Sequence, residues 1–369
     1  MDLFRFLSAS NQPMRNGQLL PAINSVTWVE KFKDPGELKI VSDIEDGFKK
    51  QLPIGCFVSH TGTEEVMMVE DHITNKDVEG KATVSTTGRS LEAPVLENRI
   101  VGAEGAFPKV GDDGDYLITA HSTQTQAVSL IQAHTEALYL YDDDDEVPYL
   151  TTSTDILSAL TSEARKIAAG TVHERLLEIL DVDNLGIKTI RPSYTGTNVN
   201  FKIHRGTDRS SSVVLSMDSG DVEQYEALES IRKLKNSVLV VGTHVQVVVH
   251  QGATSGYSRR WMTIDAKDID EKYKEPLTGG EISTISARLA TRGRQALAKQ
   301  KKISLSSADV SQNGLSIRYR EDYNLGDIVT VRADGIPGTK MRVTEHAEIL
   351  DDNGFTSYPT LELLEGEDD

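Results

Sequence analysis

Short runs in which apolar and polar residues alternate dominate the first hundred residues of the chain. Alternation with a period of two is typical of half-buried β-strands. Two segments between the runs, Asp34-Pro35-Gly36 and Thr61-Gly62-Thr63, contain residue types that favour tight turns. The predicted strands cover residues 27–32, 37–41, 56–58, 66–69 and 81–85. Strands of this number and length are enough for a small antiparallel barrel or sandwich.

Helical periodicity becomes clear only later in the chain. Apolar residues share one face over residues 156–167, and Gly170 is a natural end for that helix. Residues 171–174 form a capping box, which predicts a second helix reaching Leu180. A third helix is expected over residues 282–300. Its apolar stripe consists of Ile282, Ile285, Leu289, Ala296 and Leu297. Additional strands are predicted at residues 199–203, 213–217 and 237–249.

Two segments near opposite ends of the chain have similar patterns. The first is marked by Gly55, His72 and Gly80. The second is marked by Gly326, His346 and Gly354. The interval between the histidine and the last glycine is the same in both segments, whereas the interval before the histidine is three residues longer in the second. We interpret the segments as two copies of one small β-domain, with a longer hairpin loop in the second copy.

The pattern as a whole predicts an α+β chain that is mostly β. We expect two similar small β-barrel domains with a mixed α/β region inserted between them. The first barrel would cover residues 1–104, and the mixed insertion residues 105–235, with helices at about 154–181. Residues 236–302 would supply strands and a helix that lead to the second barrel, residues 303–369, whose acidic tail we expect to be disordered.

Composition and charge exclude several classes of protein. The net charge of −18 at pH 7 argues against a surface that grips nucleic acid or anionic membranes. Cys56 is the only cysteine, which excludes an intrachain disulfide and a Cys-based zinc site within one chain. We expect Cys56 to be a small buried residue. No apolar stretch approaches the ~20 residues of a membrane span. Because the N-terminus does not read as a secretory signal, we expect a soluble protein made in a cytoplasm.

The histidines do not form a catalytic or metal-binding pattern. His244 and His250 are the closest pair, and in one strand they would lie ~20 Å apart, too far to share a metal. His72 and His346 occupy matching positions in the two copies, which favours a shared structural role such as packing at a strand end. We therefore expect no catalytic residue, no cofactor and no metal.

Other motifs favour plain structural interpretations. Residues 252–256 (GATSG) resemble a nucleophile elbow only superficially, because Thr254 holds the central position. Asp265 and Asp268 are one of many acid pairs in an acidic chain and carry little information. The acidic run at residues 142–146 lacks the alternation of a calcium loop. The basic residues between 288 and 302 are expected on a solvated helix face, or facing an acidic loop of a neighbouring subunit.

Three segments, taken in order and spacing, resemble one known family. They are residues 25–30 (SVTWVE) with 36–38 (GEL), residues 87–93 (TGRSLEA) running to 98–101 (NRIV), and residues 322–331 (DYNLGDIVTV). With these segments the chain resembles the baseplate-hub, or tail-associated, proteins at the tail tip of long-tailed siphoviruses. The resemblance covers most of the chain and is weakest between Ala103 and Ile190.

The resemblance implies a structural virion protein that forms a homotrimeric ring at the tip of the phage tail. In such hubs two tube-like β-barrel domains per subunit alternate around the axis, so that three subunits present six similar domains to the hexameric distal tail or tail-tube ring above. Tip or fibre proteins would lie below. The tape measure protein and the phage DNA would pass through the channel without sequence-specific binding. Assembly is expected in the cytoplasm of the host bacterium.

Two other functions stay open at this point. One is a tail-associated cell-wall hydrolase, which would need a pocket that gathers carboxylates or a histidine beside a nucleophile. The other is a carbohydrate-binding protein for host recognition, which would need exposed aromatic residues. Trp28 and Trp261 are the only tryptophans, and each lies in a strand-like pattern. Many members of the resembled family carry a further fibre-like or lytic domain, whereas this chain ends just after the second copy, so we expect no enzyme.

Overall fold

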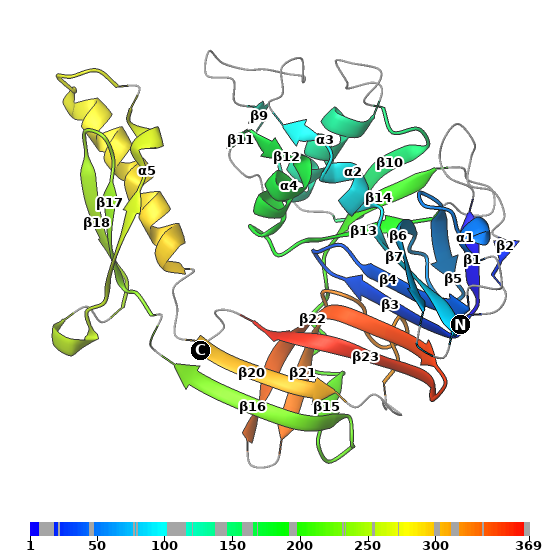
Figure 1. Cartoon of the computed structure of the whole chain (residues 1–369). Helices are drawn as coiled ribbons and strands as arrows, with labels where there is room; N and C mark the ends of the chain where they lie inside the picture. Colours follow the sequence, from blue (N-terminus) through cyan, green and yellow to red (C-terminus); the bar gives the residue numbers. More distant parts are fainter. Residues whose placement is uncertain are drawn as a thin grey trace. The chain divides into compact units, whose positions relative to one another are not determined.

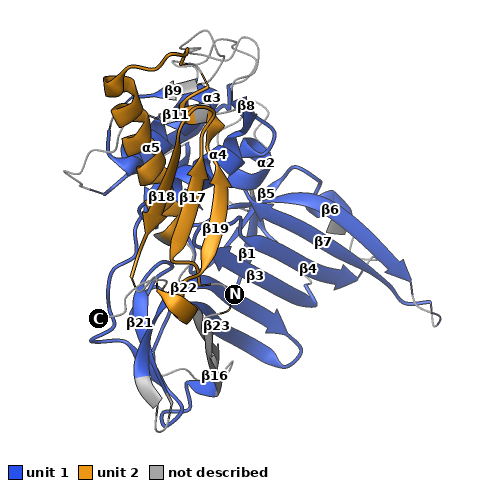
Figure 2. Ribbon diagram, turned by 90° about the vertical axis from the view of Figure 1, so that its left-hand side faces the viewer, with its two compact units in different colours: residues 1–223, 309–362 blue, residues 224–308, 363–369 orange. Residues whose placement is uncertain are grey.

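The computed structural model shows a mostly β chain with a few helices, as the alternation predicts (Figure 1). It describes residues 1–6, 18–20, 23–43, 48–76, 78, 80–101, 116–119, 121–136, 146–156, 165–167, 169–191, 198–230, 232, 234–252, 255–271, 273–298, 303–310, 317–333 and 336–364. The chain divides into two units (Figure 2). Unit 1 contains residues 1–223 and 309–362, and unit 2 contains residues 224–308 and 363–369. Our finer division at residues 104, 235 and 302 stays a prediction.

One large sheet in unit 1 contains strands from both ends of the chain. Within the described residues it has eleven strands, in the order β15-β21-β22-β3-β4-β7-β6-β5-β1-β2, with β23 paired to β22. The N-terminal strands are β1 (Leu3–Phe6), β2 (Gln18–Leu19), β3 (Ser25–Lys31), β4 (Glu37–Asp43), β5 (Phe57–His60), β6 (Met67–Lys76) and β7 (Ala82–Ser90). The later strands are β15 (Val214–Ser216), β21 (Ile328–Ala333), β22 (Ile336–Asp351) and β23 (Gly354–Leu363). The short helix α1 (Phe48–Gln51) precedes β5. In the part of the chain that is described, the sheet runs between open edges and does not close into separate barrels.

The two copies inferred from sequence have matching backbone hydrogen bonds. In the first copy the Gly55 N–H donates to the Val69 carbonyl at 2.8 Å, and the Val69 N–H donates to the Cys56 carbonyl at 2.9 Å. In the second copy Gly326 and Val343 make the same pair of bonds, again at 2.8 and 2.9 Å. Gly55 and Gly326 both have positive φ, +82° and +85°. Since both valines precede their histidine by three residues, the alignment of the copies holds at the level of individual hydrogen bonds.

The predicted reason for the three extra residues in the second copy is wrong. Strands β21 and β22 pair as far as Ala333 and Ile336, whereas in the first copy pairing between β5 and β6 stops at Val58 and Met67. The extra residues therefore lengthen the strands and not the hairpin loop. A longer alternating run adds ladder hydrogen bonds, which explains why the longer hairpin extends as strand.

The helical part of unit 1 packs around an apolar core that includes Leu130, Leu176 and Phe201. Its helices are α2 (Glu92–Leu96), α3 (Thr123–Thr135) and α4 (Val172–Leu180). Its strands are β8 (Ile100–Val101), β9 (Tyr116–Ile118), β10 (Leu150–Thr154), β11 (Arg165–Ile167), β12 (Gly170–Thr171), β13 (Gly186–Ile190) and β14 (Val199–His204). The capping box predicted for α4 is confirmed, because the side chains of Thr171 and Glu174 bond each other's backbone N–H groups.

The helix predicted over residues 156–167 is wrong at its end. Arg165–Ile167 form β11, which pairs antiparallel with β9, and residues 157–164 lie outside the described residues. Helix α3 was not predicted. Its apolar residues share their buried surface with Gln124, Gln126 and Thr135, which weakens the apolar stripe that would have marked it in the sequence.

Unit 2 contains a small sheet covered on one face by a helix. Strand β17 (Ser237–Val241) pairs antiparallel with β18 (Gln246–His250) and parallel with β19 (Trp261–Asp265). The remaining elements of this region are the paired strands β16 (Val222–Ser230) and β20 (Ile303–Val310), two short turns of 3-10 helix (Gly256–Ser258 and Lys267–Ile269), and α5 (Gly279–Ala298).

Helix α5 confirms the predicted third helix. Ile285, Leu289 and Leu297 of its stripe are buried. A side chain at Gly293 would come within 2.9 Å of Val240, so the helix lies close against the sheet. The prediction fails at Ile282, which is 43% exposed near the first turn of the helix.

Candidate functional site

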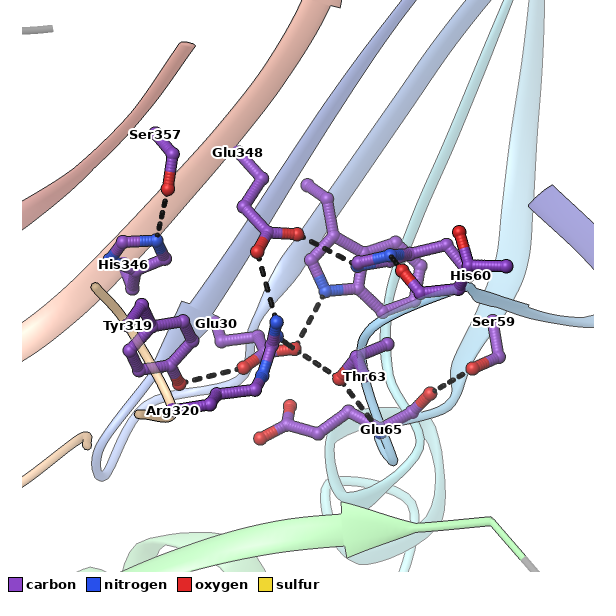
Figure 3. A network of polar contacts seen from close by, with 12 residues as sticks. Glu30, Ser59, His60, Thr63, Glu65, Tyr319, Arg320, His346, Glu348 and Ser357 are labelled. Carbon is purple, nitrogen blue, oxygen red and sulfur yellow. Dashed lines mark hydrogen bonds and ion pairs between the residues drawn. The ribbon is translucent and has the colours of Figure 1, made fainter. Parts of the chain in front are cut away.

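Polar side chains lie buried where the two copies meet in the large sheet (Figure 3). We name this cluster the polar junction. Its members are Trp28, Glu30, His60, Thr63, Tyr319, Arg320, Tyr323, His346, Glu348 and Ser357. They come from β3, from β5 and the loop after it, from residues 319–323, and from β22 and β23. The polar junction therefore connects the N-terminal copy with the C-terminal copy.

The register of β3 and β22 places the carboxylates of the junction. In β3, Val26, Trp28 and Glu30 are the buried positions of one alternating strand. Trp28 is paired with Glu348, so both carboxylates lie on neighbouring strands. The Trp28 indole N–H donates to Glu30 at 3.0 Å. The same alternation that builds an apolar core elsewhere thus brings two acids into it, and burial of this kind requires partners.

Arg320 is the cation that joins the two carboxylates. Its guanidinium donates to Glu30 at 2.6 Å and to Glu348 at 2.9 Å. The backbone of Arg320 is left-handed, with φ +68°, and its N–H donates to the Tyr323 carbonyl at 2.8 Å. A non-glycine residue in this region is strained by about 1–3 kcal/mol, which the ion pairs and the backbone bond offset.

Hydroxyl groups supply further donors to Glu30. The Thr63 hydroxyl donates to Oε1 at 2.5 Å, and the Tyr319 hydroxyl donates to Oε2 at 2.8 Å. With the indole and the guanidinium, Glu30 accepts from four side chains that belong to both ends of the chain. Burial and the charge of Glu30 raise the pKa of Tyr319, which keeps its hydroxyl protonated as a donor.

His60 lies against the other carboxylate. Its Nδ1 is 2.5 Å from the Thr61 carbonyl and its Nε2 is 3.0 Å from Glu348. Because both ring nitrogens face acceptors, the contact with Glu348 is an ion pair when the ring is protonated. Burial alone would raise the pKa of Glu348, but His60 and Arg320 hold it at about 2.

His346 is held by aromatic rings and hydroxyls. Its ring stacks on Tyr319 with centroids 3.8 Å apart, its Nδ1 is 3.2 Å from the Tyr323 hydroxyl, and its Nε2 is 2.8 Å from Ser357 Oγ. Burial lowers the pKa of His346 to about 4, although the charge of Glu348 opposes that shift. His346 is therefore a neutral packing residue at neutral pH.

Two further buried acids lie close to the junction. Burial, together with the charges of Glu30 and Glu92, raises the pKa of Glu65 well above its ordinary value. Burial also raises the pKa of Glu92, against hydrogen bonds from Ser90 and Thr189. The Ser90 hydroxyl in turn accepts from the Gly36 N–H at 2.6 Å, so this second group ties β7 to the turn before β4.

The chemistry available to the junction is structural. Glu30, His60 and His346 are each 1% exposed, so their reactive atoms do not face a substrate. A general acid or base must lie within hydrogen-bond distance of the substrate. The carboxylates are instead saturated by internal donors. This arrangement joins two halves of a sheet in a fixed geometry.

Of the residues of the junction, the sequence singled out only His346, as a packing residue, and Trp28, as a tryptophan in a strand-like pattern. Glu30 could have been found, because it falls at the buried phase of an alternating strand. Glu348 gives no such signal, since three consecutive residues of β22, from His346 to Glu348, are buried. Arg320 gives no such signal, since it lies in an irregular segment and acts through ion pairs with residues distant in sequence.

The residues weighed in the sequence are dispersed. Cys56 is buried, which raises the pKa of its thiol to about 11. His72 lies outside the junction, with Nδ1 2.9 Å from Thr86 Oγ1 on the paired strand. His244 and His250 have separate partners, Glu275 and Ser237.

The remaining motifs do not gather into a site. Asp265 pairs with Lys267 at 2.8 Å rather than with Asp268. Thr254 and residues 141–145 lie outside the described residues. Over the described ranges, no group of three or more His, Cys, Asp and Glu side chains is arranged to hold a metal ion. No helix in the same ranges has the length and apolarity to cross a membrane.

Three solved structures with the same fold are tail proteins, two of them from prophages. The 43 kDa tail protein of prophage MuSo2 from Shewanella oneidensis aligns with a TM-score of 0.58 at 13% identity, covering 99% of this chain and 98% of that one. A tail protein from Neisseria meningitidis aligns with a TM-score of 0.58 at 14% identity, covering 98% of this chain and 97% of that one. The prophage tail protein gp18 from Listeria monocytogenes aligns with a TM-score of 0.53 at 10% identity, covering 100% of this chain and 96% of that one. The chain therefore has the fold of these tail proteins.

Sequence comparison identifies the family. No curated protein matches the chain. The model of the siphovirus ReqiPepy6 Gp37-like proteins matches residues 14–361, nearly the whole chain. The predicted resemblance to siphovirus tail proteins is confirmed at this level, whereas the hub role stays a prediction. The chain belongs to the family of siphovirus ReqiPepy6 Gp37-like proteins.

Proposed function

We propose that this protein is a structural subunit of a phage tail, a homotrimeric baseplate hub at the tail tip. It joins the hexameric distal tail or tail-tube ring above to tip or fibre proteins below. The tape measure protein and the phage DNA pass through the channel that the trimer encloses. The two copies act as two tube-like domains of each subunit.

The matching hydrogen bonds of the two copies carry this proposal. Gly55 with Val69 and Gly326 with Val343 give one subunit two equivalent turns, each leading into a paired strand. A ring of three such subunits presents six similar elements, which is the number that a six-fold tube requires. Conservation of single backbone bonds between the copies supports a shared role better than a similar strand count does.

The polar junction supports the same role by making the subunit rigid. Arg320 connects residues of both copies through ion pairs that are largely shielded from water, and the His60 ring lies 3.0 Å from Glu348. A subunit that holds two copies at a fixed angle presents them in register with a ring above. A flexible connection would add an ordering cost to each of the six contacts.

The acidity of the chain suits a DNA channel. A lumen with negative charge repels the phosphates of passing DNA, so that DNA moves without binding. We infer this from the net charge of −18. Mapping the charges on the assembled particle tests it, and a neutral or basic lumen would exclude it.

The mass of the purified protein tests the trimer. Light scattering should give three times the chain mass of 40.5 kDa. A monomer at every concentration would contradict the proposal. Zymography on bacterial cell walls tests the alternative of a hydrolase, and we expect no cleared band.

A further inference from the structure

The carboxyl group of Glu65 is buried without a hydrogen-bond donor. Glu65 is 6% exposed, in the segment between β5 and β6. Its backbone is held on both sides, because its N–H donates to the Thr63 hydroxyl at 3.0 Å and its carbonyl accepts from the Ser59 hydroxyl at 2.7 Å. No dashed line reaches its carboxyl oxygens in Figure 3, and none of the described residues donates to them. An ionised carboxylate is strongly disfavoured in such surroundings.

The charges around Glu65 also favour its neutral form. The titratable groups that face it are Glu30 of β3, Glu92 of α2, Lys188 of β13, and Tyr319 and Arg320 of the segment before β21. Burial, followed by the charges of Glu30 and Glu92, raises the pKa of Glu65, against the charges of Lys188 and Arg320. Arg320 is already bonded to Glu30 at 2.6 Å. The ionised form of Glu65 would therefore add a further negative charge to a buried site that already holds two acids.

Glu92 differs from Glu65 in having donors. The Ser90 hydroxyl donates to one of its oxygens at 2.5 Å, and the Thr189 hydroxyl donates to the other. Burial raises the pKa of Glu92, but these two hydrogen bonds oppose the shift. Hydrogen bonds to a carboxylate stabilise its ionised form, and neighbouring acids titrate as a pair. The proton of this pair therefore belongs on Glu65, which has no such donors.

The segment 64–66 joins two parts of unit 1. It leads into β6 of the large sheet, and it forms an antiparallel bridge with the end of β13. The Val66 N–H donates to the Thr189 carbonyl at 3.2 Å, and the Arg191 N–H donates to the Glu64 carbonyl at 2.7 Å. Strand β13 belongs to the three-stranded sheet of the helical part, in the order β10-β14-β13. These two backbone bonds thus connect the helical part to the large sheet, directly beside the unpaired acid.

We propose that Glu65 is a proton-dependent latch between the large sheet and the helical part of unit 1. With its proton the acid is neutral, and the segment 64–66 stays paired with β13. When the proton leaves, the charge is stabilised by water only if the segment moves away from β13, so the two backbone bonds open. The latch lies within one chain, and its test does not depend on the trimer.

The direction of the pH dependence follows from the raised pKa of Glu65. The closed form keeps a proton that the open form, with the ordinary pKa of a glutamate, releases. Opening therefore becomes more favourable as the pH rises above that ordinary range. The titration of His346 acts in the opposite direction, since it destabilises the fold as the pH falls.

Hydrogen exchange with residue-level resolution, measured from pH 5 to pH 9, tests the latch. Protection factors remove the intrinsic effect of pH on exchange. We expect the protection of the Val66 and Arg191 amides to fall with rising pH, by up to about tenfold per pH unit, the limit for release of one proton. The Val343 amide, which donates to the Asp327 carbonyl at 2.9 Å within the large sheet, is the internal reference and should keep its protection.

Two neighbouring substitutions provide the matched comparison. Glu65→Gln keeps the size of the side chain and removes its titration, so the protection of Val66 and Arg191 should become independent of pH. Glu64→Gln makes the same chemical change at an exposed side chain and should behave like the original chain.

Three results would overturn the latch. The first is constant protection of Val66 and Arg191 in the original chain. The second is an equal fall at Val343, which would mean that the large sheet opens as a whole. The third is a fall in Glu65→Gln as large as in the original chain, which would place the proton on another group. The first two are measured on the original chain alone, so the test stands even where Glu65→Gln does not fold.

Discussion

At the scale of single residues, Arg320 has the largest role in the polar junction. It neutralises Glu30 and Glu348, which come from neighbouring strands and are otherwise surrounded by neutral donors and one histidine. Removing one partner of a buried ion pair costs more than the pair contributes, because the remaining charge stays buried.

Arg320→Met should therefore lower the free energy of unfolding by about 3 kcal/mol. Urea denaturation measures this loss. Lys340→Met is the control, because Lys340 and Asp208 form an exposed pair, and its removal should cost less than about 1 kcal/mol. Adding Glu348→Gln to Arg320→Met should recover part of the loss. An Arg320→Met protein as stable as the control would contradict the account.

His346 predicts a pH dependence of stability. Its pKa is lowered by burial to about 4 in the folded chain, from an ordinary value of 6.5, with Arg320 adding to the shift and Glu348 and Glu30 opposing it. Below pH 6.5 the unfolded chain therefore binds a proton that the folded chain does not. Stability falls as the pH drops from about 6.5 to 4, by up to about 3 kcal/mol from this residue.

His346→Gln tests that dependence. The difference in unfolding free energy between the original chain and the variant should shrink as the pH falls from 7 to 4. His121→Gln, at an exposed position, is the matched control and should run parallel to the original chain. A difference that is constant for His346→Gln over the same range would show that the histidine does not titrate as described.

At the scale of elements, the two matching glycine turns allow a comparison within one chain. Gly55 and Gly326 have nearly equal positive φ. A side chain at position 55 would meet no atom within 4 Å, whereas one at position 326 would come within 2.3 Å of the Phe32 ring. The backbone requirement is shared, and the packing requirement belongs to the second copy alone.

Gly55→Ala should cost about 1–2 kcal/mol through its backbone conformation. Gly326→Ala should cost about 1–3 kcal/mol more, because Phe32 must move. Thermal unfolding of the two variants side by side measures the difference. Equal losses would mean that Phe32 adjusts freely and that the two turns are energetically equivalent.

Sequence patterns predicted the elements whose periodicity is strong. The strands β3 and β4, the capping box of α4 and the stripe of α5 follow from local spacing alone. Helix α3 did not, since buried glutamines interrupt its apolar face. The polar junction could not be predicted from the sequence, for a different reason. It depends on pairing between β3 and β22, and on an arginine whose ion pair with Glu30 spans 290 residues.

At the scale of the whole molecule, the proposed hub gives the repeat a function in an assembly. A single chain joins its two copies in one open sheet within the described residues. Neither copy is closed by its own strands there, and in the proposed hub the neighbouring subunits complete the ring. A three-fold ring that carries two copies per subunit reconciles the repeat in the sequence with a six-fold tube.

The symmetry of the assembled particle tests this account most directly. Electron microscopy of the purified protein, classified without imposed symmetry, should give a three-fold ring around an open or closed channel. Its rim should show six similar lobes, formed alternately by the Gly55 copy and the Gly326 copy. Particles with two-fold or six-fold symmetry, or a three-fold ring whose rim is formed by one copy only, would contradict it.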